Sequence, residues 1–260
     1  MIKNNKGFSL VEMLLAVAIS IMLMGGMLIA IQASTYATRT EEKKVSGQQD
    51  VRAVLDMMAM EIGMASYNPT TTTPGTSTIW ADPASNSSGQ CSVLTSSPAY
   101  TSRRGIMESS STAIMVEADI NGDGIIGSTG QPNEVIRYVY DTTNQYITRC
   151  TCCTSGSTGG NGQPFLGESP TNIASGNPRG VYVINTALGI PMFTYWDATN
   201  TQILESNLTS LDANTKSTAI ASIRRIDIKL AVETEDPNAN KRQRMIYSTS
   251  VVPRNHAINY

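Results

Sequence analysis

The chain has 260 residues, of which 40% are apolar and 15% are charged. This length predicts one or two domains, and the composition suffices for one substantial core. The 19 basic and 21 acidic residues give a formal net charge of −2, which excludes the strongly basic surface of a general nucleic-acid-binding protein.

The amino-terminal segment is basic and then apolar. Two lysines precede Gly7, and an apolar run extends from 8 to 31 with Glu12 as its only formal charge. At a rise of about 1.5 Å per residue, a helix of this length crosses a hydrocarbon core of roughly 30 Å. The run is longer than the apolar part of a secretory signal, and no small-residue cleavage site follows it. We expect a spanning helix whose lysines hold the amino terminus in the cytoplasm.

The residues around Gly7 resemble the class III signal of type IV prepilins and type II secretion pseudopilins. That signal has a short basic leader ending in glycine, a phenylalanine or methionine, three mostly small or apolar residues, a glutamate and an apolar stretch. The residues that carry the resemblance are Lys3, Lys6, Gly7, Phe8, Leu10, Val11 and Glu12. The resemblance implies cleavage by a prepilin peptidase between Gly7 and Phe8, followed by methylation of the new Phe8 amino group.

Glu12 is the residue in this segment that needs a partner. Cleavage leaves an amine at Phe8 and a carboxylate four residues later, and both charges are costly near or within a membrane unless they are neutralised. In the family that the signal resembles, this glutamate pairs with the terminal amine of a neighbouring subunit and so sets the assembly register. The alternative is an ordinary single-span anchor in which the glutamate is incidental.

The helix is expected to continue beyond the span, because no proline occurs before Pro69. A helix from about Phe8 to Ser66 is therefore allowed. Its second half has an apolar stripe at three- and four-residue spacing, which we expect to pack on a sheet. The stripe consists of Val51, Val54, Leu55, Met58, Ile62 and Ala65. The other faces are predicted to carry Asp50, Arg52, Asp56 and Glu61.

Strand signals dominate the carboxyl-terminal part. Residues 67–112 are rich in Ser, Thr, Pro, Gly and Asn and are predicted to form a variable polar loop region. The clearest strand is 226–233, where polar and apolar residues alternate, and 244–252 can pair with it across a turn at 236–238. Further strands are predicted at 113–118, 134–141, 146–150, 181–186 and 192–197.

A long helix followed by an antiparallel β-sheet predicts an α+β fold. This is the order of elements in the pilin-like fold, with the first half of the helix spanning a membrane and the second half packed on the sheet. The predicted parts are a leader peptide at 1–7, a transmembrane half-helix at 8–33, a periplasmic amphipathic half-helix at 34–66, the loop region at 67–112 and a β-rich domain at 113–260.

Residues 119–124 have the pattern of a calcium-binding turn. Side-chain oxygens stand at its first, third and fifth positions, and glycine stands at its sixth. Gly130 replaces the glutamate expected at position twelve, and Glu134 follows. The predicted calcium ligands are Asp119, Asn121, Asp123, the carbonyl of Ile125, and Glu134. The alternative is a hydrated turn stabilised by asparagine and glycine.

Four cysteines lie in the part of the chain expected outside the cytoplasm, which favours disulfides. They are Cys91, Cys150, Cys152 and Cys153. A bridge between the adjacent Cys152 and Cys153 would be strained, so bridges that join Cys91 to the cluster are favoured. A zinc site is the competing interpretation, although the usual paired spacing is absent.

No catalytic constellation is recognisable in the sequence, and we predict that the protein is not an enzyme. The only histidine, His256, has no metal-ligand partner at helical spacing and is predicted to be a surface residue. Tyr195 and Trp196 alternate on a predicted strand and are expected to pack structurally rather than stack on a ligand.

The carboxyl-terminal half looks like the larger minor pilins of the PilW type and related pseudopilins. The segments that carry this looser resemblance are 52–58, 193–197, 223–228 and 248–255. Together with the leader, it implies a minor pilin of a type IV pilus that primes or joins the filament. The alternatives are a minor pseudopilin of a type II secretion system and an adhesin at the pilus tip.

This resemblance also implies partners and a location. The partners would be the prepilin peptidase, other pilins or pseudopilins, and the inner-membrane assembly platform. The chain would first be a single-pass protein of the bacterial inner membrane with a periplasmic carboxyl-terminal domain, and would then enter a pilus or pseudopilus.

Overall fold

A computed structural model describes residues 8–69, 79–82, 95–96, 103–124, 126–127, 132–151, 162–167, 181–234 and 243–257. The chain divides into two compact units, Met1–Val45 and Ser46–Tyr260. Gly7, Cys91, Ile125, Cys152 and Cys153, for which the sequence predicts roles, lie outside the described residues.

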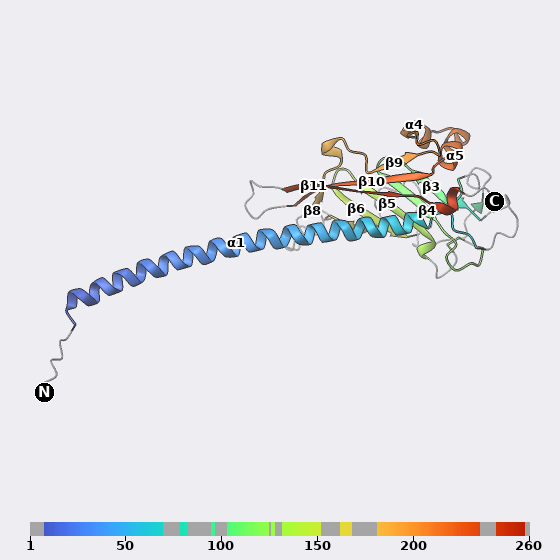
Figure 1. Cartoon of the computed structure of the whole chain (residues 1–260). Helices are drawn as coiled ribbons and strands as arrows, with labels where there is room; N and C mark the ends of the chain where they lie inside the picture. The colour runs from blue at the N-terminus through green and yellow to red at the C-terminus, as the bar shows by residue number, and fades with distance from the viewer. Residues whose placement is uncertain are drawn as a thin grey trace. The chain divides into compact units, whose positions relative to one another are not determined.

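A single helix, α1 (Leu10–Gly63), begins in the first unit and ends in the second (Figure 1). The prediction of one uninterrupted helix is confirmed. The large apolar side chains of its first part are exposed, from Leu10 to Ile31. By length and composition, α1 contains a segment able to cross a membrane. The Ser20 hydroxyl donates to the Ala16 carbonyl at 2.7 Å, so this polar group within the apolar run has a partner inside the helix.

The second unit contains two main antiparallel sheets. The five-stranded sheet has the order β3-β4-β5-β6-β7. Its strands are β3 (Ile106–Ser109), β4 (Ala113–Glu117), β5 (Val135–Asp141), β6 (Tyr146–Thr151) and β7 (Gln163–Leu166). The four-stranded sheet has the order β11-β10-β8, with β9 also paired to β10. Its strands are β8 (Val181–Val183), β9 (Phe193–Trp196), β10 (Arg225–Thr234) and β11 (Gln243–Val251).

Short elements complete the second unit. The strands β1 (Ala81–Asp82) and β2 (Thr95–Ser96) pair with each other. Two short helices, α4 (Glu205–Leu208) and α5 (Ala213–Ala221), precede β10. The 3-10 turns are η1 (Pro132–Glu134), η2 (Thr186–Leu188) and η3 (Arg254–Ala257).

The predicted hairpin of 226–233 with 244–252 is confirmed as the β10–β11 pair. Its register is continuous over nine residue pairs, from Ile226 opposite Val251 to Thr234 opposite Gln243. The region predicted as a polar loop also contains β3. This strand forms because β4 supplies a pairing partner for a short apolar island, and that partner cannot be recognised from the composition of 67–112.

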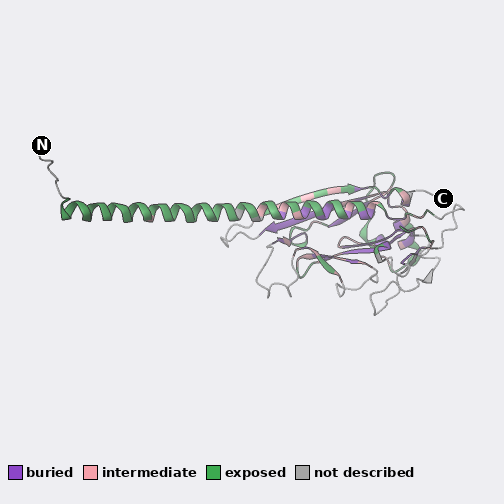
Figure 2. Ribbon diagram, turned by 90° about the horizontal axis from the view of Figure 1, so that it is seen from below, coloured by how far each residue is buried: buried purple, intermediate pink, exposed green. Residues whose placement is uncertain are grey.

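The core of the second unit lies where the end of α1 meets both sheets. All six residues of the predicted helix stripe are buried and belong to one apolar cluster with residues of both sheets. In Figure 2, the first part of α1 is exposed, and buried residues appear only in its second part. A smaller apolar cluster includes Met107 on β3, Met115 on β4 and Val135 on β5. In each of these strands the adjacent residue belongs to the main core, so the two clusters lie on opposite faces of the sheet. The five-stranded sheet is therefore buried on both faces in this region.

One prediction for α1 is wrong. Glu61 was expected on a polar face of the helix, but only 6% of it is exposed. Its carboxylate faces the five-stranded sheet, where charged and hydroxyl partners are available. These partners come from strands that are distant in the sequence, so helical periodicity alone does not reveal them.

Candidate functional site

The candidate assembly site is the start of α1. Phe8 and Ser9 precede the helix, and the amide of Met13 donates to the Ser9 carbonyl at 3.2 Å. Glu12 lies in the first turn, where the free N–H groups and the helix dipole favour a negative charge. Exposed apolar side chains flank Glu12 on both sides. Glu12 is the only acidic residue in this apolar run.

This arrangement has a specific chemical capacity. An exposed apolar helix surface partitions into lipid or packs against other helices, whereas an isolated carboxylate in such a surface favours a cationic partner. Phe8 becomes the terminal residue if the chain is cut after Gly7, and its amine then supplies a cation one helical turn before Glu12. Phe8 and Glu12 therefore lie together at the beginning of the apolar segment.

A second polar site joins the end of α1 to the five-stranded sheet. The Arg149 guanidinium donates two hydrogen bonds to Glu61, from Nε to Oε2 at 3.1 Å and from Nη2 to Oε1 at 2.6 Å. The Tyr138 hydroxyl also donates to Glu61 Oε2. Tyr138 and Arg149 are directly opposite each other on β5 and β6, so the strand register brings both donors to one carboxylate. Burial raises the pKa of Tyr138, which keeps its hydroxyl protonated as a donor.

The predicted calcium turn is organised by two buried carboxylates. Asp119 Oδ1 accepts from the Gly122 amide at 2.8 Å, and its Oδ2 accepts from the Gly124 amide at 3.0 Å. Glu134 Oε2 accepts from the Gly127 amide at 2.8 Å, while its Oε1 faces two further amides of the same loop. The carboxylates therefore act as acceptors that hold the loop closed.

Two further predicted ligands, Asn121 and Asp123, lie on the outside of this turn. The Asn121 side-chain amide donates to Asp123 Oδ2 at 2.8 Å, and both residues are exposed. Among the described residues, no group of three or more His, Cys, Asp and Glu side chains is arranged to hold a metal ion. An ionised carboxylate has about four lone-pair sites, so Asp119 and Glu134 retain acceptor capacity beside these backbone hydrogen bonds. Calcium binding at this turn stays a prediction.

His256 is buried, and its predicted place on the surface is wrong. Its Nε2 lies 2.9 Å from the Ile220 carbonyl oxygen, and its Nδ1 lies 2.9 Å from Ser66 Oγ and 3.0 Å from the Arg104 carbonyl oxygen. Burial lowers the pKa of His256, and the nearby Arg224 and Arg104 charges act in the same direction. The imidazole connects η3 to three segments that are distant in sequence, which suits a structural role.

Cys150 lies on β6 and is disulfide-bonded. Its partner lies outside the described residues. The connectivity among the four cysteines therefore stays a prediction.

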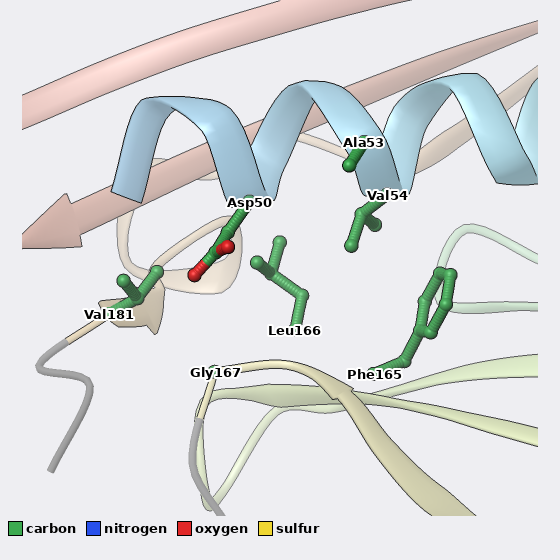
Figure 3. Close-up of a pocket in the computed structure, with 7 residues that line it drawn as sticks. All are labelled: Asp50, Ala53, Val54, Phe165, Leu166, Gly167 and Val181. Atoms are coloured by element: carbon green, nitrogen blue, oxygen red, sulfur yellow. The ribbon is translucent and has the colours of Figure 1, made fainter. Parts of the chain in front are cut away.

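A small cavity lies between α1 and the strands β7 and β8, with a volume of about 120 Å³. Figure 3 shows the Asp50 side chain pointing from α1 toward Val181. The described lining contains this one carboxylate and otherwise apolar side chains or glycine. The lining residues are Asp50, Ala53, Val54, Phe165, Leu166, Gly167 and Val181. A single carboxylate provides neither a nucleophile with its base nor an acid–base pair.

Comparisons with known proteins point to the amino-terminal segment. Residues 2–28 match the family model described as the prokaryotic N-terminal methylation motif. This match includes Gly7, Phe8 and Glu12. No curated protein matches the sequence as a whole.

One similar solved structure is a type IV-like pilin from Thermus thermophilus. It is 12% identical, the alignment covers 81% of this chain and 97% of that chain, and the TM-score is 0.37. This similarity is too low for individual residues to be transferred. The methylation motif at 2–28, followed by a long apolar helix and antiparallel sheets, makes the chain similar to type IV prepilin-like proteins.

Proposed function

We propose that this protein is a minor pilin, a non-enzymatic subunit that primes or joins a type IV pilus. The observation that carries the proposal is the position of Glu12, the only charge in an exposed apolar run and one helical turn after Phe8. In this proposal, prepilin peptidase cuts after Gly7 and the Phe8 amine is methylated. Glu12 then pairs with the terminal amine of a neighbouring subunit.

The size of the second unit supports a minor subunit. It contains a five-stranded and a four-stranded sheet in addition to the end of α1. Such a domain offers a large periplasmic surface for contacts with other pilins and with the assembly platform. The chain would be held in the bacterial inner membrane by the first part of α1 until it is extracted into the filament.

The decisive experiment compares two glutamates on the same helix. Glu12→Ala should still be inserted and cleaved, because the apolar span and Gly7 are unchanged, but it should be missing from sheared filaments. Glu41→Ala is the matched control, because Glu41 is 66% exposed and lies beyond the span. Mass spectrometry of the mature terminus reports cleavage and methylation, and immunoblotting of filament fractions reports incorporation. Normal incorporation of Glu12→Ala would refute the assembly role.

A role as a type II secretion pseudopilin shares the same amino-terminal chemistry. The two functions are separated by deleting the gene and measuring surface pili and secreted enzymes in parallel. Loss of pili with normal secretion supports the minor pilin. Loss of secretion with normal pili supports the pseudopilin.

A further inference from the structure

The strand β11 forms a long, regular edge of the four-stranded sheet. It has nine residues and pairs only with β10 among the described strands. The register between the two strands has no shift. Figure 2 shows this strand beside α1, with exposed and intermediate residues alternating along it. An edge of this kind presents a row of unused backbone donors and acceptors.

The register identifies which backbone groups face outward. The Lys229 amide donates to the Met192 carbonyl, and the Ile184 amide donates to the Ala231 carbonyl. The backbone N–H and C=O groups of odd-numbered residues in β10 therefore point away from β11. Even-numbered residues of β10 therefore bond to β11, and their partners are its odd-numbered residues. The outward groups belong to Arg244, Ile246, Ser248 and Ser250. None of their backbone groups bonds to a described residue outside the sheet.

The other sheet edges carry protective features that β11 lacks. The edge strand β3 has four residues and a register shift. The edge strand β7 contains Pro164 and also has a register shift. The strand β8 has three residues, and its Val183 amide donates to the Gln145 carbonyl. Short strands, bulges and prolines are among the usual means of preventing strand addition, and β11 has none of them, with Arg244 as the one charged residue among its outward positions.

The direction of α1 argues against a second copy as the partner. Gln48 contacts Met245 and Arg52 lies over the Tyr247 ring, while Gly63 lies near Val251, so residues 48–63 run in the same direction as β11. Two copies joined antiparallel through β11 would have opposed α1 segments. That arrangement does not fit two chains anchored in one membrane, a step that rests on the proposed function.

The charge along β11 indicates the chemistry of the partner. Arg244 stands at the start of the strand, with 63% of its side chain exposed and a long contact of 3.7 Å to Glu233. Arg244 therefore places a cation at the end of the outward row where β11 begins. The next outward residue, Ile246, is 59% exposed, and the remaining two are serines. An antiparallel partner strand has its carboxyl-terminal end beside Arg244.

We infer that β11 accepts an extended segment of another protein, which pairs antiparallel and carries acidic residues at its carboxyl-terminal end. Backbone hydrogen bonds to Arg244, Ile246, Ser248 and Ser250 would provide most of the affinity. The acidic end would set the register and the direction. This surface would bind a partner subunit in the periplasm independently of the contacts made by Glu12.

A synthetic peptide with the sequence of Arg225–Thr234 is a suitable probe. It has the alternating pattern of β10, and its Glu233 is the residue that lies opposite Arg244 in the native register. The full-length chain in detergent is titrated into the fluorescein-labelled peptide, and anisotropy reports binding. We expect saturable binding, weakened by about tenfold or more when Glu233 of the peptide is changed to lysine. Absence of saturable binding would overturn the proposal.

Two variants of the chain test the binding edge. Ser248→Pro removes an outward N–H and leaves the bonds to β10 in place, so it should weaken peptide binding by about tenfold while the melting temperature changes little. In the alternative binding mode, the peptide replaces β10, and this exchange would not depend on the outward N–H of Ser248. Equal binding of the peptide to the wild-type chain and to Ser248→Pro would therefore refute pairing at the outer edge.

Arg244→Glu provides a test that does not alter the backbone. It should weaken binding of the original peptide and restore binding of the lysine peptide. If neither peptide responds to Arg244→Glu, the assigned direction and charge preference are wrong. Because these measurements use isolated protein, they are independent of the filament assay for Glu12.

Discussion

Arg149 holds Glu61 through two hydrogen bonds, at 3.1 and 2.6 Å, and so fixes the rotation of the end of α1 against the five-stranded sheet. Tyr138 donates to the same carboxylate from the neighbouring strand. The buried Glu61 carboxylate thus accepts three hydrogen bonds. Removal of Arg149 would leave this carboxylate buried without a compensating positive charge. This contact explains how a charged residue can lie in the buried face of the helix.

Removal of Arg149 should destabilise the second unit strongly. We expect Arg149→Met to lower the free energy of unfolding by about 3–5 kcal/mol, because Glu61 stays buried without its cation. The double variant Glu61→Leu with Arg149→Met should recover much of this loss. Chemical denaturation of the full-length chain measures each value. Lys44→Met, which removes an exposed partner of Glu41, is the control and should cost less than about 1 kcal/mol. Equal effects of the two single variants would contradict the role of the buried pair.

His256 should make stability depend on pH below neutrality. Burial lowers the pKa of its imidazole in the folded state, while the unfolded chain has the ordinary value of about 6.5. The unfolded state therefore binds protons more readily, so stability is complete above about pH 6.5 and is lost as the pH falls below it. Melting temperatures between about pH 5 and 8 would show the decline, and His256→Gln should flatten it. A wild-type chain that gains stability on acidification through this range would show the opposite sign.

Gly105 should not tolerate a side chain. Its φ is +80°, and a Cβ there would lie 2.9 Å from the Glu117 carbonyl oxygen and from Ser66 backbone atoms. These segments approach closely because Ser66 donates to the Glu117 carbonyl and Glu117 donates to the Gly105 carbonyl. Gly105→Ala is expected to cost more than about 1 kcal/mol in thermal unfolding. Gly63→Ala, with 3.7 Å to Val251, is the control and should be neutral or stabilising. Similar melting temperatures for both variants would disprove the close contact.

The calcium prediction can be tested with one exposed ligand. Asp123 is exposed and contacts Asn121, two residues away, so Asp123→Ala should leave the metal-free melting temperature nearly unchanged. If calcium binds, it raises the melting temperature of the wild-type chain, and Asp123→Ala reduces that rise. Asp141→Ala, which alters an unrelated turn, is the control. A wild-type melting temperature that ignores both calcium and chelator would end the calcium hypothesis.

The disulfide of Cys150 should stabilise the second unit. Reduction is expected to lower the free energy of unfolding by about 2–4 kcal/mol, mainly through the entropy of the unfolded chain. Peptide mapping without reductant should recover Cys91 linked to one of the clustered cysteines. Recovery of Cys150 as a free thiol from protein isolated under oxidising conditions would contradict the bridge.

Several features could be predicted because they depend on residues close in sequence. The apolar run with Glu12 predicts the span and the assembly signal, since length and charge alone decide whether a helix suits a membrane. The spacing of Val51 through Ala65 identifies the buried stripe of α1, and the alternation in β10 identifies its apolar buried face. The opposite face of β10 is not wet throughout, because Ala231 and Glu233 are also buried. In each case the repeat of the backbone brings the relevant side chains together.

Other features depend on partners that only the tertiary structure brings near. Glu61 is buried because Arg149, 88 residues away, neutralises it, and His256 is buried because Ser66, 190 residues away, and two carbonyl oxygens surround it. A local pattern treats both as surface residues, because polarity alone predicts exposure. The place of β11 at the edge of its sheet, among the described strands, likewise follows from strand order. The membrane signal, the helix stripe and the β10–β11 hairpin could be predicted from residues that are near one another in the sequence. Which polar groups are buried, and which of the described strands lies at a sheet edge, depend on pairing between distant residues and therefore required the folded structure.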